Sequence, residues 1–291
     1  MPDTTESLLE RVRGIRPDLK IEQEECNEEG LINNVLIINQ ALVFRFARTP
    51  EYAELMQAEL KILDLVRPRV GVQVPTPFYQ SADCMVYPLI PGQTLSRKMV
   101  LEFDEKTRAV VAGQLGAFLY QLHSTDVSNA SWEIPATRAP TRRQAWLDTY
   151  AAVQARLYPL FQKYQVEWAE DLFDRVLQDE DFFNFPPALI NGDFASYHIL
   201  YDPQAGKING VIDFGMAGLG DAASDFGNLI SIYGESFVRK MQPSYPGLEA
   251  YLTRARFYAL GLELEWVLRG LESSETFWFT AHLGGARDML G

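Results

Sequence analysis

The stretch of sequence that decides the fold is residues 189–230, which read LINGDFASYHILYDPQAGKINGVIDFGMAGLGDAASDFGNLI. Apolar residues lead into a Gly-Asp pair that ends at Asp193, and a short strand begins at His198. The turn sequence DPQAG and a return strand follow, so Asp213 stands at the end of a predicted β-hairpin. This geometry predicts that Asp193, His198 and Asp213 lie close together at the open end of the hairpin, although they span 20 residues of the chain.

These three side chains are the parts that phosphoryl transfer requires. A carboxylate must orient the attacking hydroxyl and accept its proton, and a metal ion must neutralise the phosphates. We expect Asp193 to be the catalytic base, a role typically worth about 10² to 10⁴ in rate. His198 and Asp213 are expected to hold magnesium. Each part alone is weak evidence, because a lone Asp-Phe-Gly is more often a turn, but the combination around one hairpin favours the functional interpretation.

The stretch resembles the catalytic core of the aminoglycoside phosphotransferase family, which has a protein-kinase-like fold. That family usually reads His-Gly-Asp, four residues and Asn, followed later by Ile-Asp-Phe/Trp-Gly/Ser. Here Asn191 stands where the histidine is usual, and His198 stands where the metal-binding asparagine is usual. The run from Asp193 to Leu200 resembles the aminoglycoside 2''-phosphotransferase branch, whose metal ligand is also a histidine.

The resemblance leaves the substrate open. Macrolide kinases of the same family can also carry the histidine, and the branch often has Asp where this chain has Met216. The family's next marker is present as Gly220-Asp221 and Asp225. The resemblance implies that Asp225 is a structural anchor, which holds the catalytic loop through its backbone amides and does not touch substrate.

The pattern along the chain and the resemblance both predict an α+β, bilobal fold. Residues 1–91 read as a small β-rich N-terminal lobe with one main helix at 51–66, which would bind the nucleotide. The strands expected at 31–38 and 41–46 are separated by Asn39-Gln40, a candidate turn. After a Pro/Gly turn, residues 92–291 read as a larger, mainly helical catalytic and substrate-binding lobe, with helical spacing and few helix breakers at 103–123 and 141–181.

A nucleotide-binding lobe needs a cation on a strand to hold phosphates and a helix glutamate to fix that cation. Arg45 lies in the middle of the second strand, and Glu59 lies in the following helix. Kinases of proteins use lysine at the first place, whereas many members of the resembled family carry arginine. The alternative is a surface strand residue paired with a surface helix.

The remaining nucleotide contacts follow the family template. The phosphate-covering loop is expected around residues 29–34, with Gly30 and Asn33 as candidates, although no glycine-rich fingerprint is present. The hinge is expected at 87–92, where the backbone of Tyr87 and Leu89 would read a purine edge. These residues do not discriminate between ATP and GTP.

The acceptor side is expected to bind a cationic small molecule. Aminoglycosides are polycations, and the C-terminal helices carry Glu235 and Glu263, with aromatic residues such as Trp266 interleaved. The alternative is a solvated helix face with a few core aromatics. The net charge of −13 disfavours nucleic acid as a partner, because an acidic protein repels phosphate backbones.

Other whole-chain features favour a cytoplasmic protein, and a monomer is taken as the default oligomeric state. No apolar run approaches the roughly 20 residues that cross a bilayer, and the N-terminus lacks a signal-peptide pattern. The two cysteines have no partners at metal-ligand spacing, which argues against zinc and against a disulfide framework. Four alternatives stay open: a macrolide kinase, a kinase of a metabolite alcohol such as a sugar, a choline-like alcohol or homoserine, a nucleotide-binding pseudokinase, and a degenerate enzyme of low activity marked by Arg45 and Asn191.

Overall fold

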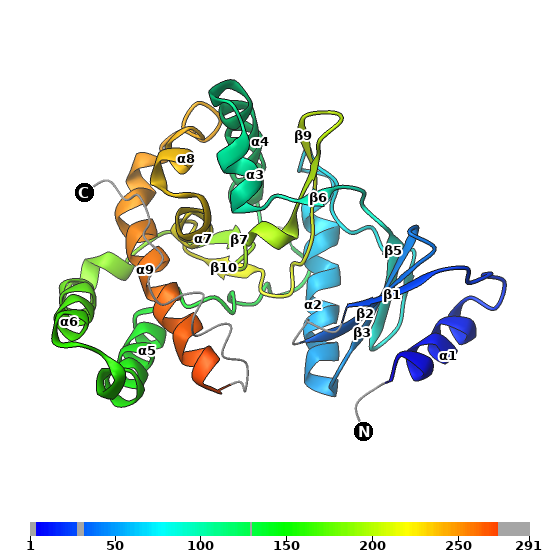
Figure 1. Ribbon diagram of the computed structural model, residues 1–291, viewed down its shortest axis with the longest axis horizontal. Coiled ribbons are helices and arrows are strands. Elements are labelled where there is room, and N and C mark those ends of the chain that lie inside the picture. Colours follow the sequence, from blue (N-terminus) through cyan, green and yellow to red (C-terminus); the bar gives the residue numbers. More distant parts are fainter. Residues whose placement is uncertain (1–3, 28–31, 129, 273–291) are drawn as a thin grey trace.

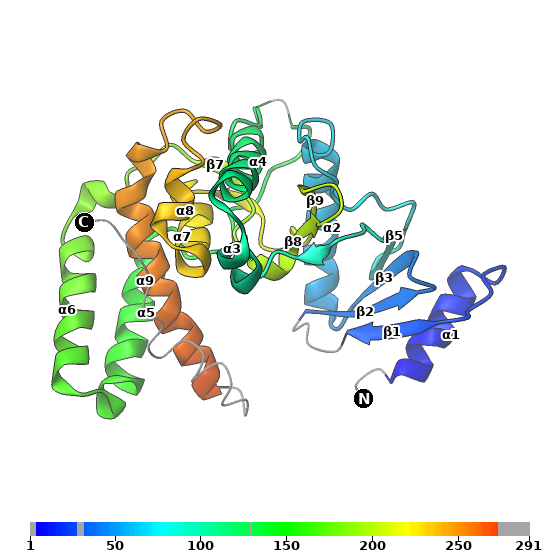
Figure 2. The ribbon, with the colours of Figure 1, turned by 45° about the horizontal axis from the view of Figure 1, so that its top comes forward.

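The computed structural model describes residues 4–27, 32–128 and 130–272. Its N-terminal part is a five-stranded antiparallel sheet in the order β1-β2-β3-β5-β4 (Figure 1). Two helices flank this sheet, one on each face (Figure 2). The elements are α1 (Thr5–Ile15), β1 (Glu24–Asn27), β2 (Asn33–Ile38), β3 (Leu42–Ala47), α2 (Pro50–Val66), β4 (Tyr79–Gln80) and β5 (Cys84–Pro88).

Strand β3 shows why the sheet carries a helix on both faces. Phe44 and Phe46 belong to a buried cluster with α1, whereas Val43 and Ala47 belong to a second cluster with α2. Because successive side chains of a strand point to opposite faces, Arg45 shares the α2 face with Val43 and Ala47. The alternation of this strand therefore directs a buried arginine toward α2.

The turn between β2 and β3 is a three-residue connection, one residue longer than expected. Asn39 and Gln40 both adopt left-handed conformations, with φ of 55° and 50°. The Asn39 side chain also accepts hydrogen bonds from the backbone N–H groups of Glu22 and Gln23, at 2.8 and 3.0 Å. The turn asparagine thus fixes the chain that joins α1 to β1.

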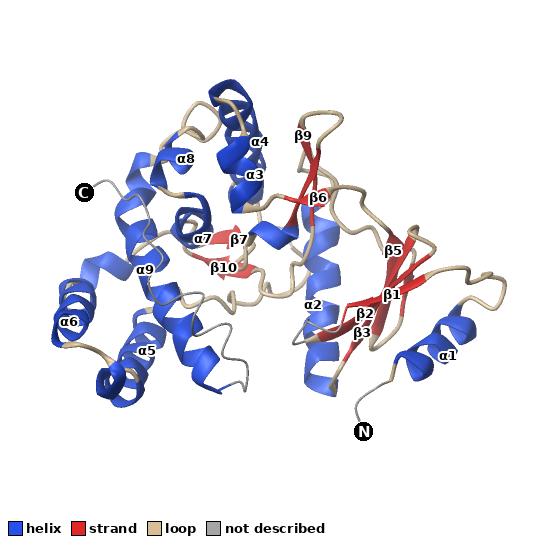
Figure 3. Cartoon of the chain, viewed as in Figure 1, coloured by secondary structure: helices blue, strands red, loops and turns tan. Residues whose placement is uncertain are grey.

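The C-terminal part is mainly helical and carries two small sheets, with strand orders β10-β7 and β6-β8-β9 (Figure 3). The predicted α+β architecture, a small β-rich part followed by a larger helical part, is confirmed. The elements are β6 (Gln93–Thr94), α3 (Arg97–Glu102), α4 (Glu105–His123), α5 (Arg143–Arg156), α6 (Lys163–Leu177), β7 (Ala188–Ile190), β8 (Ile199–Asp202), β9 (Lys207–Val211), β10 (Gly218–Gly220), α7 (Ala223–Tyr233), α8 (Glu235–Arg239) and α9 (Glu249–Glu272), with 3₁₀ turns at Tyr158–Leu160, Glu180–Phe183 and Ser196–His198.

The helical spacing predicted over residues 141–181 corresponds to more than one helix. The structure forms α5 and α6 as two helices with a 3₁₀ turn between them. Pro159 lies in this turn, and proline removes a backbone donor and clashes with the preceding helical turn. The chain therefore reverses here, so that α5 and α6 pack beside α9 (Figure 1). Among the helices of the described residues, none has both the length and the apolar character needed to span a membrane.

Helices α7 and α9 pack closely enough that glycine is required at their crossing. A Cβ atom at Gly227 would lie 2.7 Å from the Cβ of Tyr258 and 3.1 Å from the carbonyl oxygen of Ala255. This tight contact fixes α7, and the first turn of α7 carries Asp225. The helical core thereby sets the position of Asp225, which contacts the loop after β7.

Candidate active site

The loop after β7 is held by a single buried carboxylate. Asp225 accepts hydrogen bonds from the backbone N–H groups of Asn191 and Gly192, at 2.9 and 2.8 Å. Its side chain is fully buried, and its Oδ2 atom, which accepts from Asn191, also lies 3.0 Å from His123 Nε2. Asp225 therefore makes the backbone-amide contacts expected of a loop anchor, one residue before Asp193.

The carboxamide of Asn191 joins the catalytic loop to the strand end that carries Asp213. Its Nδ2 donates to the carbonyl oxygen of Asp213 at 2.9 Å, and its Oδ1 accepts from the backbone N–H of Asp193 at 3.1 Å. The sequence identified this position only as a departure from the usual histidine. A side chain with one donor and one acceptor at this spacing is the signal that would have indicated the bridge.

His198 lies between the two aspartates. Its Nδ1 is 3.8 Å from Asp193 Oδ2, and its Nε2 is 3.6 Å from Asp213 Oδ2. The same Nδ1 is 3.0 Å from the backbone carbonyl oxygen of Asp193. Because a carbonyl oxygen only accepts, this contact places a proton on Nδ1. The other ring nitrogen, Nε2, then faces the Asp213 carboxylate.

His198 Nε2 and the Asp213 carboxylate face each other at 3.6 Å, and an imidazole nitrogen and a carboxylate oxygen are both groups that bind metal ions in proteins. Asp213 and His198 therefore fit the expected role of metal ligands. In the part of the chain that the structure describes, no group of three or more such side chains gathers at one point. Magnesium usually takes one or two carboxylates from a protein and keeps several waters beside the phosphates of the substrate.

Asp213 is held in a strained conformation. Its φ of 62° lies in the left-handed region, which is unfavourable for residues other than glycine. The backbone N–H of Gly215 donates to its Oδ1 at 3.0 Å. Burial raises the pKa of Asp213, but the charges of Arg45 and His198 and the Gly215 bond outweigh burial, so its pKa lies below the ordinary value. Asp213 is thus ionised.

The opposite shift applies to Asp193. Burial raises its pKa above the ordinary value; the His198 charge opposes this, and the Asp213 carboxylate adds to it. The two carboxylates therefore differ in environment, one favouring the ionised form and the other favouring proton uptake. This separation suits one residue to hold a cation and the other to accept a proton.

The Arg45–Glu59 pair connects the N-terminal sheet to this site. Arg45 Nη1 donates to Glu59 Oε1 at 2.7 Å, and both side chains are buried. Arg45 Nη2 lies 4.0 Å from Asp213 Oδ1, and the backbone N–H of Phe214 donates to Glu59 Oε1 at 3.1 Å. Burial lowers the pKa of Arg45, but Glu59 and Asp213 outweigh burial and raise it, so the guanidinium stays charged.

The expected phosphate loop and hinge are only partly visible. Gly30 lies outside the described residues, and Asn33 starts β2 as a buried residue whose Oδ1 has no hydrogen-bond partner among the described residues. Tyr87 belongs to β5, and burial raises the pKa of its hydroxyl to about 12. The N–H of Leu89 already donates to the Ala41 carbonyl oxygen at 2.7 Å. Leu89 would therefore offer a purine its carbonyl oxygen and not its N–H group.

Two of the expected acceptor-side residues need correction. Glu235 is fully buried, and its carboxylate accepts from the guanidinium groups of Arg239 and Arg256 at 2.8 to 2.9 Å. It is neutralised inside the helical core and does not face a substrate. Glu263 is also buried, and its Oε1 accepts from the hydroxyl of Ser231, so it packs between α9 and α7.

Trp266 lies one helical turn further along α9 and is partly buried. The guanidinium carbon of Arg269 is 5.3 Å from the centroid of its ring. The neighbouring Glu265 accepts from the hydroxyl of Thr149 at 2.9 Å, and burial raises its pKa against the effects of Thr149 and Arg269. This part of α9 thus combines an aromatic ring, an arginine and a carboxylate, and is not purely acidic.

Residues 26–258 match the profile of the phosphotransferase enzyme family, APH. A relative, the uncharacterized protein YcbJ of Bacillus subtilis (strain 168), is 25% identical over 239 residues, which cover 77% of this chain and 75% of the relative. The solved GDP and kanamycin complex of APH(2'')-IIIa has a TM-score of 0.84 and 23% identity over 95% of each chain. Macrolide 2'-phosphotransferase type I has a TM-score of 0.69 and 21% identity, covering 99% of this chain and 100% of that one.

The two structural likenesses confirm the expected protein-kinase-like fold. They extend over nearly the whole length of each chain, so the fold assignment covers both the β-rich and the helical part. The family profile covers most of the chain, including the hairpin with Asp193, His198 and Asp213. The chain therefore belongs to the phosphotransferase enzyme family, as its resemblance to the aminoglycoside phosphotransferases predicted.

Proposed function

We propose that this protein transfers the γ-phosphate of ATP or GTP to a hydroxyl group of a small molecule. One observation carries the proposal: His198 lies 3.8 Å from the Asp193 carboxylate and 3.6 Å from the Asp213 carboxylate. The Arg45–Glu59 pair reaches the same place from the N-terminal sheet. A base, two metal ligands and a buried cation therefore converge, which are the parts of a phosphoryl-transfer site.

In the proposed reaction, Asp193 orients the acceptor hydroxyl and takes its proton. The new bond forms between the acceptor oxygen and the γ-phosphorus, the bond from that phosphorus to the β-phosphate oxygen breaks, and the nucleoside diphosphate leaves with that electron pair. The raised pKa of Asp193 makes it a better proton acceptor than an ordinary aspartate. When bound, magnesium would neutralise charge on the phosphates, and Asp213 and His198 Nε2 are the residues that would hold it.

We further infer that the acceptor is an aminoglycoside. The net charge of −13 supports a cationic small molecule, and the similar APH(2'')-IIIa structure is a complex with kanamycin. A second candidate is a less highly charged acceptor, either a macrolide or a metabolite alcohol. The burial of Glu235 and Glu263 favours this second candidate, because it leaves fewer exposed carboxylates for a polycation.

The test is nucleotide consumption by the purified protein with magnesium. ATP and GTP are each assayed against aminoglycosides, macrolides and small alcohols, and the product is checked for added phosphate by mass spectrometry. We expect phosphorylation of one acceptor class and its loss in Asp193→Ala, with nucleotide binding retained in a direct binding assay. Wild-type turnover by Asp193→Ala would contradict the assignment of the base. Nucleotide binding without turnover on the whole panel would indicate a pseudokinase or an acceptor outside these classes.

A further inference from the structure

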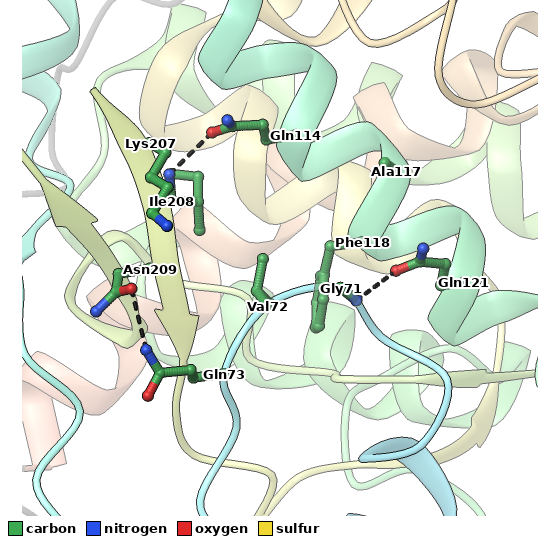
Figure 4. A pocket seen from close by; sticks show the side chains of 10 residues that line it. All are labelled: Gly71, Val72, Gln73, Gln114, Ala117, Phe118, Gln121, Lys207, Ile208 and Asn209. Carbon is green, nitrogen blue, oxygen red and sulfur yellow. Dashed lines mark hydrogen bonds between the residues drawn. The ribbon is translucent and has the colours of Figure 1, made fainter. Parts of the chain in front are cut away.

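A cavity of about 300 Å³ lies between α4, strand β9 and the loop that follows α2 (Figure 4). Side-chain amides from three positions tie these elements together along its wall. Gln121 Oε1 accepts from the N–H of Gly71 at 2.9 Å, and Gln114 Oε1 accepts from the N–H of Ile208 at 2.8 Å. The third amide is that of Gln73. None of the residues assigned to the reaction lines this cavity, so these three amides have no direct part in the reaction.

The third amide contact joins the loop after α2 directly to strand β9. Gln73 Nε2 donates to Asn209 Oδ1 at 3.0 Å (Figure 4). The backbone of the same residues pairs as well: the N–H of Gln73 donates to the carbonyl oxygen of Asn209 at 3.0 Å, and the N–H of Val211 donates to the carbonyl oxygen of Gln73 at 2.9 Å. The loop thus adds a short parallel bridge to β9.

Asn209 also reaches the hinge. Its Nδ2 donates to the carbonyl oxygen of Pro91 at 2.6 Å. The neighbouring Gly210 must lack a side chain, because a Cβ atom there would lie 2.6 Å from Ile90 Cγ2 and 3.0 Å from the carbonyl oxygen of Gln73. The segment after β5 and the loop after α2 therefore both meet β9 at this one place.

Strand β9 and helix α2 both connect this junction to the candidate active site. Strand β9 ends at Val211, two residues before Asp213. From there the N–H of Phe214 donates to Glu59 of α2, and α2 continues at its C-terminal end into the loop that carries Gln73. A shift of β9 relative to α2 would therefore move Asp213 relative to Glu59 and Arg45.

We propose that Gln73 and Asn209 are positioning residues for phosphoryl transfer. They hold β9 to the loop after α2 and to the hinge, and so keep Asp213 in register with Glu59 before any ligand binds. The proposal rests on the proposed function of Asp213 as a metal ligand. It assigns a role in the reaction to two amides that touch neither substrate nor metal.

The first test is hydrogen exchange of the ligand-free protein, resolved to the segment 207–216. Asn209→Ala and Gln73→Ala should each accelerate exchange there by about 2- to 10-fold, the range that corresponds to one lost hydrogen bond. Gln57→Ala is the matched control, because its amide bonds to the carbonyl oxygens of Ser81 and Ala82 within the N-terminal part. Its segment 207–216 should exchange as in the wild type. Unchanged exchange in both test variants would overturn the proposal.

The second test separates positioning from general stability. With the acceptor found for the wild type, Asn209→Ala should raise the magnesium concentration for half-maximal turnover by about 3- to 10-fold, while kcat at saturating magnesium stays close to that of the wild type. Gln57→Ala should leave both unchanged. A loss of kcat with unaltered magnesium dependence would overturn the positioning role. If the wild type binds no nucleotide, the proposed function fails, whereas the exchange experiment on the ligand-free protein still decides the junction.

Discussion

Replacing Asp225 by asparagine should weaken both the fold and the reaction. The buried carboxylate accepts from the N–H groups of Asn191 and Gly192 through different oxygens. Whichever way an asparagine amide turns, its NH₂ group faces one of these two donors. One charge-assisted hydrogen bond is lost and one buried N–H is left without an acceptor, which together cost about 3 kcal/mol. For a chain of 291 residues this corresponds to a fall in Tm of about 5 °C.

The effect on turnover should exceed the effect on stability. Asp225 holds the two residues that precede Asp193, so its replacement displaces the base itself. A misplacement of about 1 Å can cost about 10²-fold in rate. We expect kcat of Asp225→Asn to fall by about that factor at a temperature where the variant is still folded. Thermal unfolding followed by circular dichroism, together with the nucleotide-consumption assay, measures both quantities.

Asp221 provides a matched control four residues earlier. It is equally buried and accepts from Arg254 at 2.6 and 3.1 Å and from the Tyr258 hydroxyl at 3.0 Å. These contacts tie the start of α7 to α9 and do not involve the catalytic loop. Asp221→Asn should therefore lose stability to a similar degree while kcat stays close to the wild-type value. Equal loss of kcat in both variants, or full activity of Asp225→Asn, would refute the loop-anchor reasoning.

Three further changes test other parts of the structure. Arg45→Lys replaces a planar fork that faces both Glu59 and Asp213 with a single point charge, so nucleotide affinity measured by calorimetry should fall by about tenfold; unchanged affinity would argue against a phosphate role. Glu235→Gln should lower the free energy of unfolding by about 3 kcal/mol without changing the acceptor KM, because this buried carboxylate pairs with Arg239 and Arg256. A raised KM would indicate that Glu235 contacts the acceptor. Iodoacetamide at pH 8 should label Cys26 and leave Cys84 unmodified until the protein unfolds, because burial raises the pKa of the Cys84 thiol to about 12; two labels on the native protein, counted by mass spectrometry, would contradict this.

The sequence predicts best what short-range patterns determine. The hairpin that carries His198 and Asp213 follows from a turn between two short apolar runs. In the structure His198 Nε2 lies 3.6 Å from Asp213 Oδ2. The contact between Arg45 and Glu59 follows from a period of two along a strand and from a helix that covers one face of the sheet. In both cases local periodicity sets the direction of the side chain.

Directions that depend on distant partners could not be predicted in this way. Glu235 lies on a short helix in a region of mixed charge, and only the packing of α9 against it shows that Arg256 neutralises its carboxylate. Glu263 shares a helical face with Trp266 by spacing, but α7 covers the part of the face on which the glutamate lies. Helical periodicity identifies a face, whereas the neighbouring helix decides whether that face meets solvent, substrate or core.

The departure of this chain from the usual His-Gly-Asp pattern does not loosen the site. Asn191 bonds through its side chain to the backbone of Asp193 on one side and of Asp213 on the other, at 3.1 and 2.9 Å. An amide provides the one donor and one acceptor that this bridge needs, and it does so at every pH because it does not titrate. The loop is held a second time by Asp225, which contacts the backbone and is therefore indifferent to the side chain at position 191. Two independent attachments therefore hold Asp193 and Asp213 in register, and replacement of the usual histidine by Asn191 leaves neither of them without support.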